Sequence, residues 1–91
     1  MSTYFVGSAT WDPGAITDLN HEAVDVTVTG AALGDKVFVT HSIDVADLQL
    51  LGTVTATNVV TAVLTNSGVG SPNMATGTVY CVVLSNSGQH V

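Results

Sequence analysis

The sequence contains very little charge, and its last 44 residues contain none. Charged residues make up 9% of the 91 residues, Lys36 is the only lysine or arginine, and no Asp, Glu, Lys or Arg follows Asp47. This long C-terminal stretch therefore offers no carboxylate for acid–base catalysis and no cation for a phosphate group, so we expect no enzymatic activity. The formal net charge of −6 also argues against nucleic acid and anionic membranes as partners, because both are bound by basic patches.

Cysteine is equally scarce, and targeting signals are missing. Cys81 is the only cysteine, so no disulfide can form within the chain, and we expect a buried thiol in a strand over residues 79–84. The N-terminal residues lack the basic and apolar regions of a signal peptide, and no apolar run approaches the ~20 residues that cross a bilayer. These absences predict a protein that is made in a cytoplasm and is not built for secretion or for a membrane.

What the chain does contain is alternation of β-branched residues. Hydrophobic residues make up 46% of the sequence, and Val24, Val26 and Val28 alternate with polar residues in segment 22–29, which is typical of a strand with one solvated face. Further strands are predicted over residues 36–41, 48–56, 59–66 and 77–85, with a hairpin turn at Thr57-Asn58. About five or six closely spaced strands without a convincing helix predict an all-β fold, either a small antiparallel β-sandwich or a jelly-roll-like barrel.

Residues 1–20 are predicted to form an extended N-terminal arm and residues 21–91 the sandwich, within a single domain overall. Gly7 and the Asp12-Pro13-Gly14 sequence interrupt any strand that begins in the apolar residues before them. The apolar side chains of the arm are Tyr4, Phe5, Val6 and Trp11. Two interpretations stay open: Trp11 plugs one end of the sandwich, or these side chains hold the arm on a neighbouring subunit or on a capsid.

Two of the predicted strands are apolar on both faces. In the last strand, one face holds Val79, Cys81 and Val83, and the other holds Tyr80, Val82 and Leu84. In the strand that begins at residue 59, the two faces hold Val60, Ala62 and Leu64, and Val59 and Val63. An antiparallel sheet with a solvated face should alternate apolar and polar residues. We therefore expect a subunit contact to cover the second faces, with Val63, Tyr80 and Val82 in the oligomer interface.

Few side chains are candidates for metal binding. His21, His41 and His90 are the only histidines, and they do not form the close groups that zinc sites show. Asp44 and Asp47 lie on a short helical turn predicted over residues 44–48, where solvated capping carboxylates are expected. We expect no metal, no cofactor and no small-molecule ligand.

Five short segments resemble, in sequence and in order along the chain, a known type of module. They are residues 9–16 (ATWDPGAI), 26–35 (VTVTGAALGD), 52–56 (GTVTA), 58–61 (NVVT) and 75–79 (ATGTV). In these segments the chain resembles a β-sandwich module of bacteriophage virion-surface proteins, found in capsid decoration (cement) proteins and in head- and tail-fibre proteins. The resemblance implies a trimeric β-sandwich on the outside of a virion, without catalytic activity. Val63, Tyr80 and Val82 depart from it, because similar positions of the module often hold polar or basic residues.

The resemblance and the short chain together favour one function. We expect a capsid decoration protein that is made in the host bacterial cytoplasm, binds the outer surface of the major capsid protein lattice as a homotrimer, and stabilises the shell of the virion. The alternative is the tip domain of a head or tail fibre that binds a host receptor or glycan. The predicted loops contain no aromatic residue, which argues against stacking on a sugar.

Overall fold

The computed structural model describes residues 4–45, 48–68, 70 and 72–85, and these residues form strands joined by turns. The strands are β1 (Tyr4–Trp11), β2 (Gly14–Ala15), β3 (His21–Thr27), β4 (Lys36–His41), β5 (Gln49–Ala56), β6 (Val59–Thr65), β7 (Asn73–Met74) and β8 (Gly77–Leu84). No helix occurs in the described ranges, so none there is long and apolar enough to cross a membrane. Of the predicted helical turn over residues 44–48, residues 46–47 lie outside the described part of the chain.

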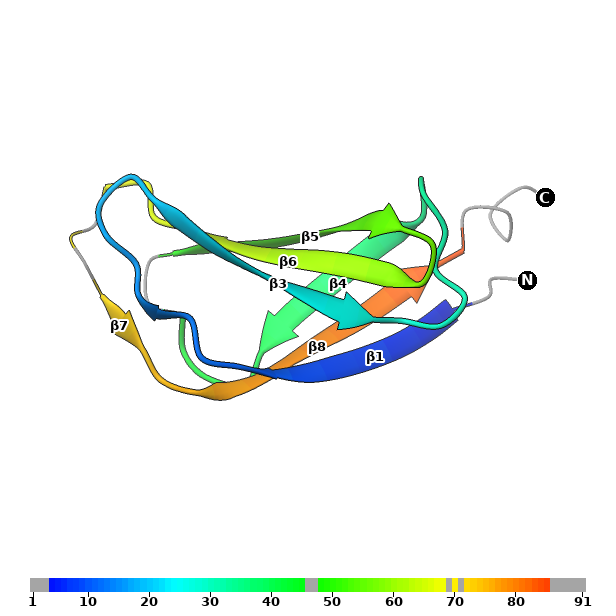
Figure 1. The fold of residues 1–91 in the computed structure, drawn as a ribbon, viewed down its shortest axis with the longest axis horizontal. Coiled ribbons are helices and arrows are strands. Elements are labelled where there is room, and N and C mark those ends of the chain that lie inside the picture. Colours follow the sequence, from blue (N-terminus) through cyan, green and yellow to red (C-terminus); the bar gives the residue numbers. More distant parts are fainter. Residues whose placement is uncertain (1–3, 46–47, 69, 71, 86–91) are drawn as a thin grey trace.

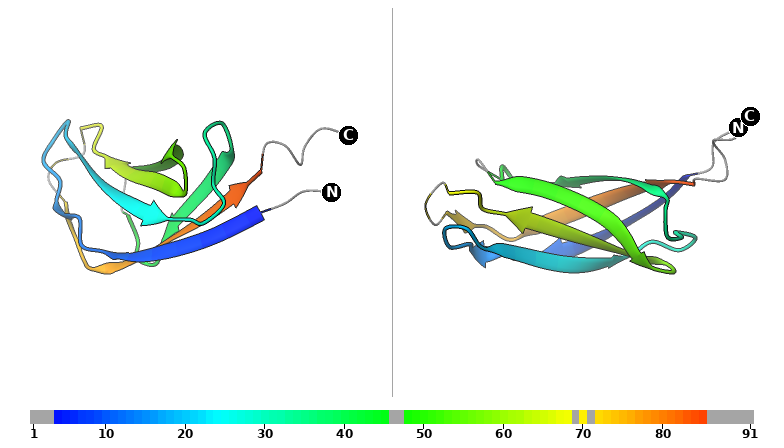
Figure 2. Two further views of the ribbon diagram at one scale, coloured as in Figure 1. Left: turned by 45° about the vertical axis from the view of Figure 1, so that its right-hand side comes forward. Right: turned by 90° about the horizontal axis from the view of Figure 1, so that it is seen from above.

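Two antiparallel sheets pack face to face and form a β-sandwich (Figure 1). One sheet has the strand order β1-β8-β4 and the other the order β3-β6-β5, while β2 and β7 make a small third sheet at one end. Figure 2 shows the two layers from the side and from above. The all-β sandwich predicted from the alternation of apolar residues is therefore confirmed.

The hydrophobic core lies between the two sheets, where every second residue of the longer strands points inward. Because side chains alternate between the faces of a strand, the valines at positions 26, 60, 79 and 83 all reach this interior. The buried hydrophobic residues are Trp11, Ile16, Val26, Val28, Ala31, Leu48, Val54, Val60, Ala62, Leu64, Met74, Val79, Cys81 and Val83. The predicted burial of Cys81 is confirmed.

The predicted N-terminal arm is wrong for residues 4–11, which form a full edge strand of the sandwich. β1 pairs with β8 without a register shift, from Tyr4 opposite Leu84 to Trp11 opposite Gly77. Gly7 does not break this strand. A Cβ atom there would meet the backbone carbonyl of Thr27, the last residue of β3, and would lie 2.8 Å from Cγ2 of Val28, which follows β3. Glycine is therefore the residue that lets the two layers approach. Residues 1–3 of the predicted arm lie outside the described residues.

The predicted hairpin between β5 and β6 is confirmed, and Asn58 explains its tight turn. Asn58 adopts a left-handed conformation with φ of 67°, which asparagine tolerates better than most residues. Its side-chain oxygen accepts a hydrogen bond of 2.8 Å from the backbone N–H of Gly30. The turn is thereby fastened to the loop that leads from β3 to β4.

Candidate interaction surface

The outer face of the β1-β8-β4 sheet gathers exposed apolar side chains from all three strands. Val6 and Phe38 flank Val82 in one cross-strand row. The exposed fractions are 66% for Tyr4, 64% for Val6, 58% for Phe38 and 50% for Tyr80. We call this surface the apolar face, and it consists of Tyr4, Val6, Phe38, Tyr80, Val82 and Leu84.

Strand alternation divides the four side chains of the predicted arm into two pairs. Tyr4 and Val6 point outward and join the apolar face, whereas Phe5 points inward and packs against the core. Trp11 is only 7% exposed, and its ring centre lies 5.6 Å from that of His41. Trp11 therefore plugs the sandwich, which is the first of the two interpretations that its sequence position left open.

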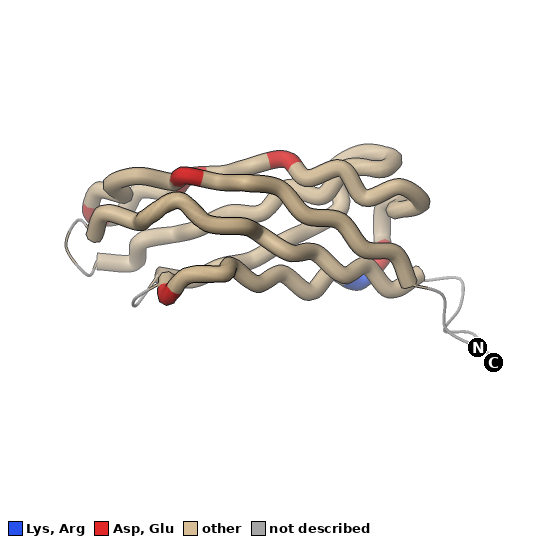
Figure 3. Tube along the Cα trace, turned by 90° about the horizontal axis from the view of Figure 1, so that it is seen from below, with Lys and Arg blue, Asp and Glu red and all other residues tan. Residues whose placement is uncertain are grey.

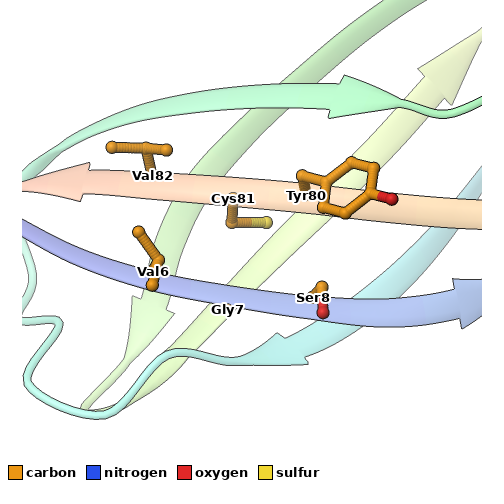
Figure 4. A pocket seen from close by; sticks show the side chains of 6 residues that line it. All are labelled: Val6, Gly7, Ser8, Tyr80, Cys81 and Val82. Atoms are coloured by element: carbon orange, nitrogen blue, oxygen red, sulfur yellow. The ribbon is translucent and has the colours of Figure 1, made fainter.

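An open hollow lies in the apolar face between β1 and β8 (Figure 4). Its volume is about 430 Å³, and it is lined by Val6, Gly7, Ser8, Tyr80, Cys81 and Val82. The small Ser8 side chain lies beside the much larger Tyr80, and this difference in size leaves the hollow in the surface. The Ser8 hydroxyl and the Tyr80 phenol are its only side-chain oxygens. The hollow therefore suits an apolar protein surface better than a polar ligand.

The apolar face carries no carboxylate, although the chain has a net charge of −6. β1 and β8 contain no charged residue, and Lys36 of β4 is the only charged side chain among the outward positions of this sheet. Seen from the side of this sheet, the acidic segments lie on other parts of the chain (Figure 3). The face is thus the part of the described surface where another protein approaches without meeting negative charge.

Val63 lies on the opposite outer face, so the three predicted interface residues do not form one surface. Val63 belongs to β6, where it stands between Ala23 of β3 and Leu51 of β5. The two outer faces of a sandwich point in opposite directions. No single patch of one copy therefore holds all three residues, and only a heterologous contact, in which the apolar face of one copy meets the opposite face of the next, would bury Val63 together with Tyr80 and Val82. Their place in an oligomer interface stays a prediction.

The face around Val63 is rich in hydroxyl groups rather than in aromatic side chains. The Thr61 hydroxyl donates a hydrogen bond of 2.7 Å to Asp25, and it lies 2.8 Å from the Thr55 hydroxyl. Such local hydrogen bonds and exposed carboxylates are typical of a solvated sheet face. The sandwich therefore has one face with exposed aromatic rings and one face on which hydroxyl groups predominate, although Leu51, which is 66% exposed, lies beside Val63 there.

Phe38 is the member of the apolar face that the sequence analysis missed. The strand over residues 36–41 was predicted with the bounds that the structure shows. Alternation within this strand places Phe38 on the same face of the strand as Lys36 and Thr40. It does not tell whether that face points into the core or outward. Only the pairing of β4 with β8, which sets Phe38 beside Val82, assigns it to the apolar face.

The histidine and cysteine side chains show structural environments. Nδ1 of His41 accepts a hydrogen bond of 3.3 Å from the backbone N–H of Ile43, and burial lowers the pKa of this imidazole. Burial raises the pKa of the Cys81 thiol, which makes it a poor nucleophile. Within residues 4–45, 48–68, 70 and 72–85, no three His, Cys, Asp or Glu side chains gather as metal ligands. His90 and Asp47 lie outside these residues.

Comparison with protein-family models, with curated proteins and with solved structures finds no match to this chain. The apolar face and the resemblance described above are therefore what a functional proposal has to build on.

Proposed function

We propose that this chain is a structural protein that decorates the outer surface of a bacteriophage capsid and docks on the major capsid protein through its apolar face. The observation that carries this proposal is the concentration of Tyr4, Val6, Phe38 and Tyr80, each at least half exposed, on one sheet without carboxylates. The largest contiguous apolar patch of a soluble protein, which typically measures a few hundred Å², is often a functional contact site. The resemblance to virion-surface modules supplies the identity of the partner.

The mechanism of such a protein is thermodynamic linkage rather than chemistry. A molecule that binds the assembled shell but not its free subunits stabilises the shell in proportion to its affinity and concentration. The sandwich suits this role because its docking residues lie on paired strands and not on loops, so little conformational entropy is lost on binding. The homotrimer expected from the sequence rests on the resemblance alone and stays a prediction, and it is incompatible with the dimer proposed below from the strand edges.

The test is co-sedimentation of the purified protein with empty capsids of the phage that encodes it. Val82→Asp places a carboxylate at the centre of the apolar face, and Val63→Asp places one on the central strand of the opposite face. Since both residues are half-buried outward positions on central strands, the two variants form a matched pair. We expect Val82→Asp to weaken capsid binding at least about tenfold, a difference of about 1.4 kcal/mol, and Val63→Asp to bind like the wild type.

Two results would contradict the proposal. One is that the folded wild-type protein does not co-sediment with capsids at all. The other is that Val63→Asp loses binding while Val82→Asp keeps it, which would move the docking surface to the opposite face.

A fibre-tip domain that binds a glycan is the second candidate, and one observation favours it. Tyr4, Phe38 and Tyr80 expose aromatic rings on a single sheet face, with the Ser8 hydroxyl between two of the strands. Aromatic rings combine a large apolar surface with specific stacking geometry, which suits a sugar ring. A glycan array separates the candidates: saturable glycan binding that Tyr80→Ala abolishes, together with no capsid binding, would replace the first proposal with the second.

A further inference from the structure

The two main sheets of the sandwich have four edge strands, and three of them carry features that oppose pairing with another strand. Unpaired backbone groups at a sheet edge form a template for strand addition, which proteins block with charges, prolines or bulges. β3 carries Glu22 and Asp25, and β4 begins with Lys36. β5 has a register shift between Val54 and Ala56 that interrupts its ladder.

β1 has none of these protective features in the described structure. Its sequence, YFVGSATW, contains no charge and no proline, and its pairing with β8 runs through all eight residues without a shift. It hydrogen-bonds in a ladder only to β8, since the order of its sheet is β1-β8-β4. The other edge of β1 is therefore a regular, uncharged template.

We propose that β1 pairs with β1 of a second copy, antiparallel about a two-fold axis near Gly7 and Ser8, and that the protein is thereby a dimer with a continuous six-stranded sheet. An antiparallel pair about a two-fold axis is self-complementary, so one strand supplies both sides of the contact. The outward residues of β1 have even numbers, from Tyr4 to Thr10. A register that pairs even with even numbers keeps both apolar faces on the same side of the joined sheet.

Charge favours a second copy at this edge over the β3 edge, whereas the equally uncharged β5 is set apart from β1 by its register shift. Each copy carries a formal net charge of −6, so two copies repel unless they meet where negative charge is absent. β1 offers such a site, because no charged residue lies between Tyr4 and Trp11. Pairing through β3 would instead bring Glu22 and Asp25 of both copies together, and like charges across a strand pair are destabilising.

The joined sheet also brings the apolar face to the size that a stable contact needs. β1 and β8 have eight residues each and β4 has six. At about 3.3 Å per residue and about 4.8 Å between strands, they give a face of roughly 350 Å². Docking of one such face buries about 700 Å² over both partners, below the ~1,200 Å² at which stable interfaces begin. Two faces side by side bury about 1,400 Å², which is within the standard range.

The experiment is sedimentation equilibrium of the full chain across a wide concentration range, with a matched pair of lysine variants. Ser8 of β1 and Thr40 of β4 are both exposed and both flank Tyr80, on opposite sides of the same row. Ser8→Lys and Thr40→Lys therefore add the same charge to the same sheet at opposite edges. Only Ser8→Lys brings two introduced ammonium groups close to the two-fold axis.

We expect the wild type to be a dimer, Ser8→Lys to raise the dimer dissociation constant at least about tenfold, and Thr40→Lys to change it by less than twofold. Circular dichroism checks that both variants fold. If Ser8→Lys does not fold, Val6→Lys replaces it, because Val6 is an exposed outward residue on the other side of Gly7, and Phe38→Lys is then its matched control on β4. In hydrogen exchange, amides of β1 should gain protection as the dimer forms. A wild-type monomer or trimer overturns the proposal, and so does an equal effect of the two lysine variants.

The strand pairing rests on the edge of β1, and only the argument from docking area rests on the proposed capsid function, so the two proposals fail separately. A monomer that co-sediments with capsids contradicts the dimer and keeps the function. A dimer that ignores capsids contradicts the function and keeps the strand pairing.

Discussion

The indole ring of Trp11, at the end of β1, lies 5.6 Å from the imidazole of His41, at the end of β4, with 42° between the ring planes. β8 runs between these strands, and Gly77 at its start makes the contact possible. A Cβ atom at Gly77 would lie 2.6 Å from Cε1 of His41. The two rings therefore close one end of the sandwich, and the imidazole of His41 is partly buried there.

This burial makes the stability of the protein depend on pH. Desolvation lowers the pKa of His41 below its usual value, which is about 6.5 in the unfolded chain. Above that pH both states are neutral, and the full stability is present. As the pH falls below about 6.5, the unfolded state takes up a proton before the folded state does, so the free energy of unfolding decreases until the lowered pKa has been passed.

We expect the midpoint temperature of thermal unfolding to decrease when the pH is lowered from about 7.5 to about 5.5. In His41→Asn this decrease should be smaller. Asparagine keeps an acceptor for the backbone N–H of Ile43 but does not titrate. His21→Asn, at an exposed site on β3, is the control and should follow the wild type. An unchanged pH profile in His41→Asn would show that other groups cause the fall.

Gly7→Ala is expected to destabilise the protein by about 1–3 kcal/mol, the usual cost of overpacking. The new methyl group would press on the carbonyl of Thr27 and on the side chain of Val28. Urea unfolding measures the change, and Ser8→Ala, at the exposed neighbouring position, should stay within about 0.5 kcal/mol. In a free arm Gly7→Ala would instead be neutral or slightly stabilising, because alanine reduces the entropy of the unfolded chain.

The same glycine shows why β1 was missed in the sequence while β4, β5, β6 and β8 were found. Alternating apolar residues, mostly valines, indicate a strand from the local sequence alone, and the predicted bounds of those four segments agree with the structure to within one residue. Gly7 looks like a strand breaker when only its neighbours in sequence are considered. Glycine is needed at position 7 because Thr27 and Val28 approach it closely. This tertiary contact joins residues about twenty positions apart, so no local sequence pattern contains it.

The apolar face could be predicted only in part from the sequence, because alternation assigns residues to the faces of a single strand and does not reveal how the strands pair. Alternation correctly placed Tyr80 and Val82 on one face of β8 and Val63 on one face of β6. It does not tell which strands share a sheet, and that decides which faces merge. Tyr4 and Val6 join Tyr80 and Val82 because the first long strand pairs with the last, whereas β6 lies in the other sheet.

Asn66 should be one of the most sensitive polar positions of the protein. It is 1% exposed, and its amide donates hydrogen bonds to the carbonyls of Ile16, at 2.9 Å, and Gly70, while its oxygen accepts one of 2.9 Å from Gly68. Asn66→Ala leaves the buried carbonyl of Ile16 and the partly buried backbone groups of Gly68 and Gly70 without these partners, which costs about 1–3 kcal/mol.

Asn66→Asp should not restore the stability, because a carboxylate cannot donate to the two carbonyls. Urea unfolding again provides the measurement. Asn73→Ala, at an exposed position of β7, is the control and should change the free energy of unfolding by less than about 0.5 kcal/mol. If Asn66→Asp were as stable as the wild type, the amide donors would not be what holds this loop.

Phe38 and Val39 are neighbours on β4, and we expect substitution of the smaller Val39 to destabilise the protein more than substitution of the larger Phe38. Phe38 is 58% exposed on the apolar face, whereas Val39 points inward, packs against the core and lies against Gly52 of β5. Phe38→Ser removes the larger side chain but should cost no more than about 0.5 kcal/mol in urea unfolding, and it should raise the ammonium sulfate concentration at which the protein precipitates. Val39→Ser should cost about 1–3 kcal/mol, because it places a hydroxyl against the core. If Phe38→Ser were the more destabilising of the two, Phe38 would belong to the core, and the apolar face would lose the aromatic ring that its β4 side contributes.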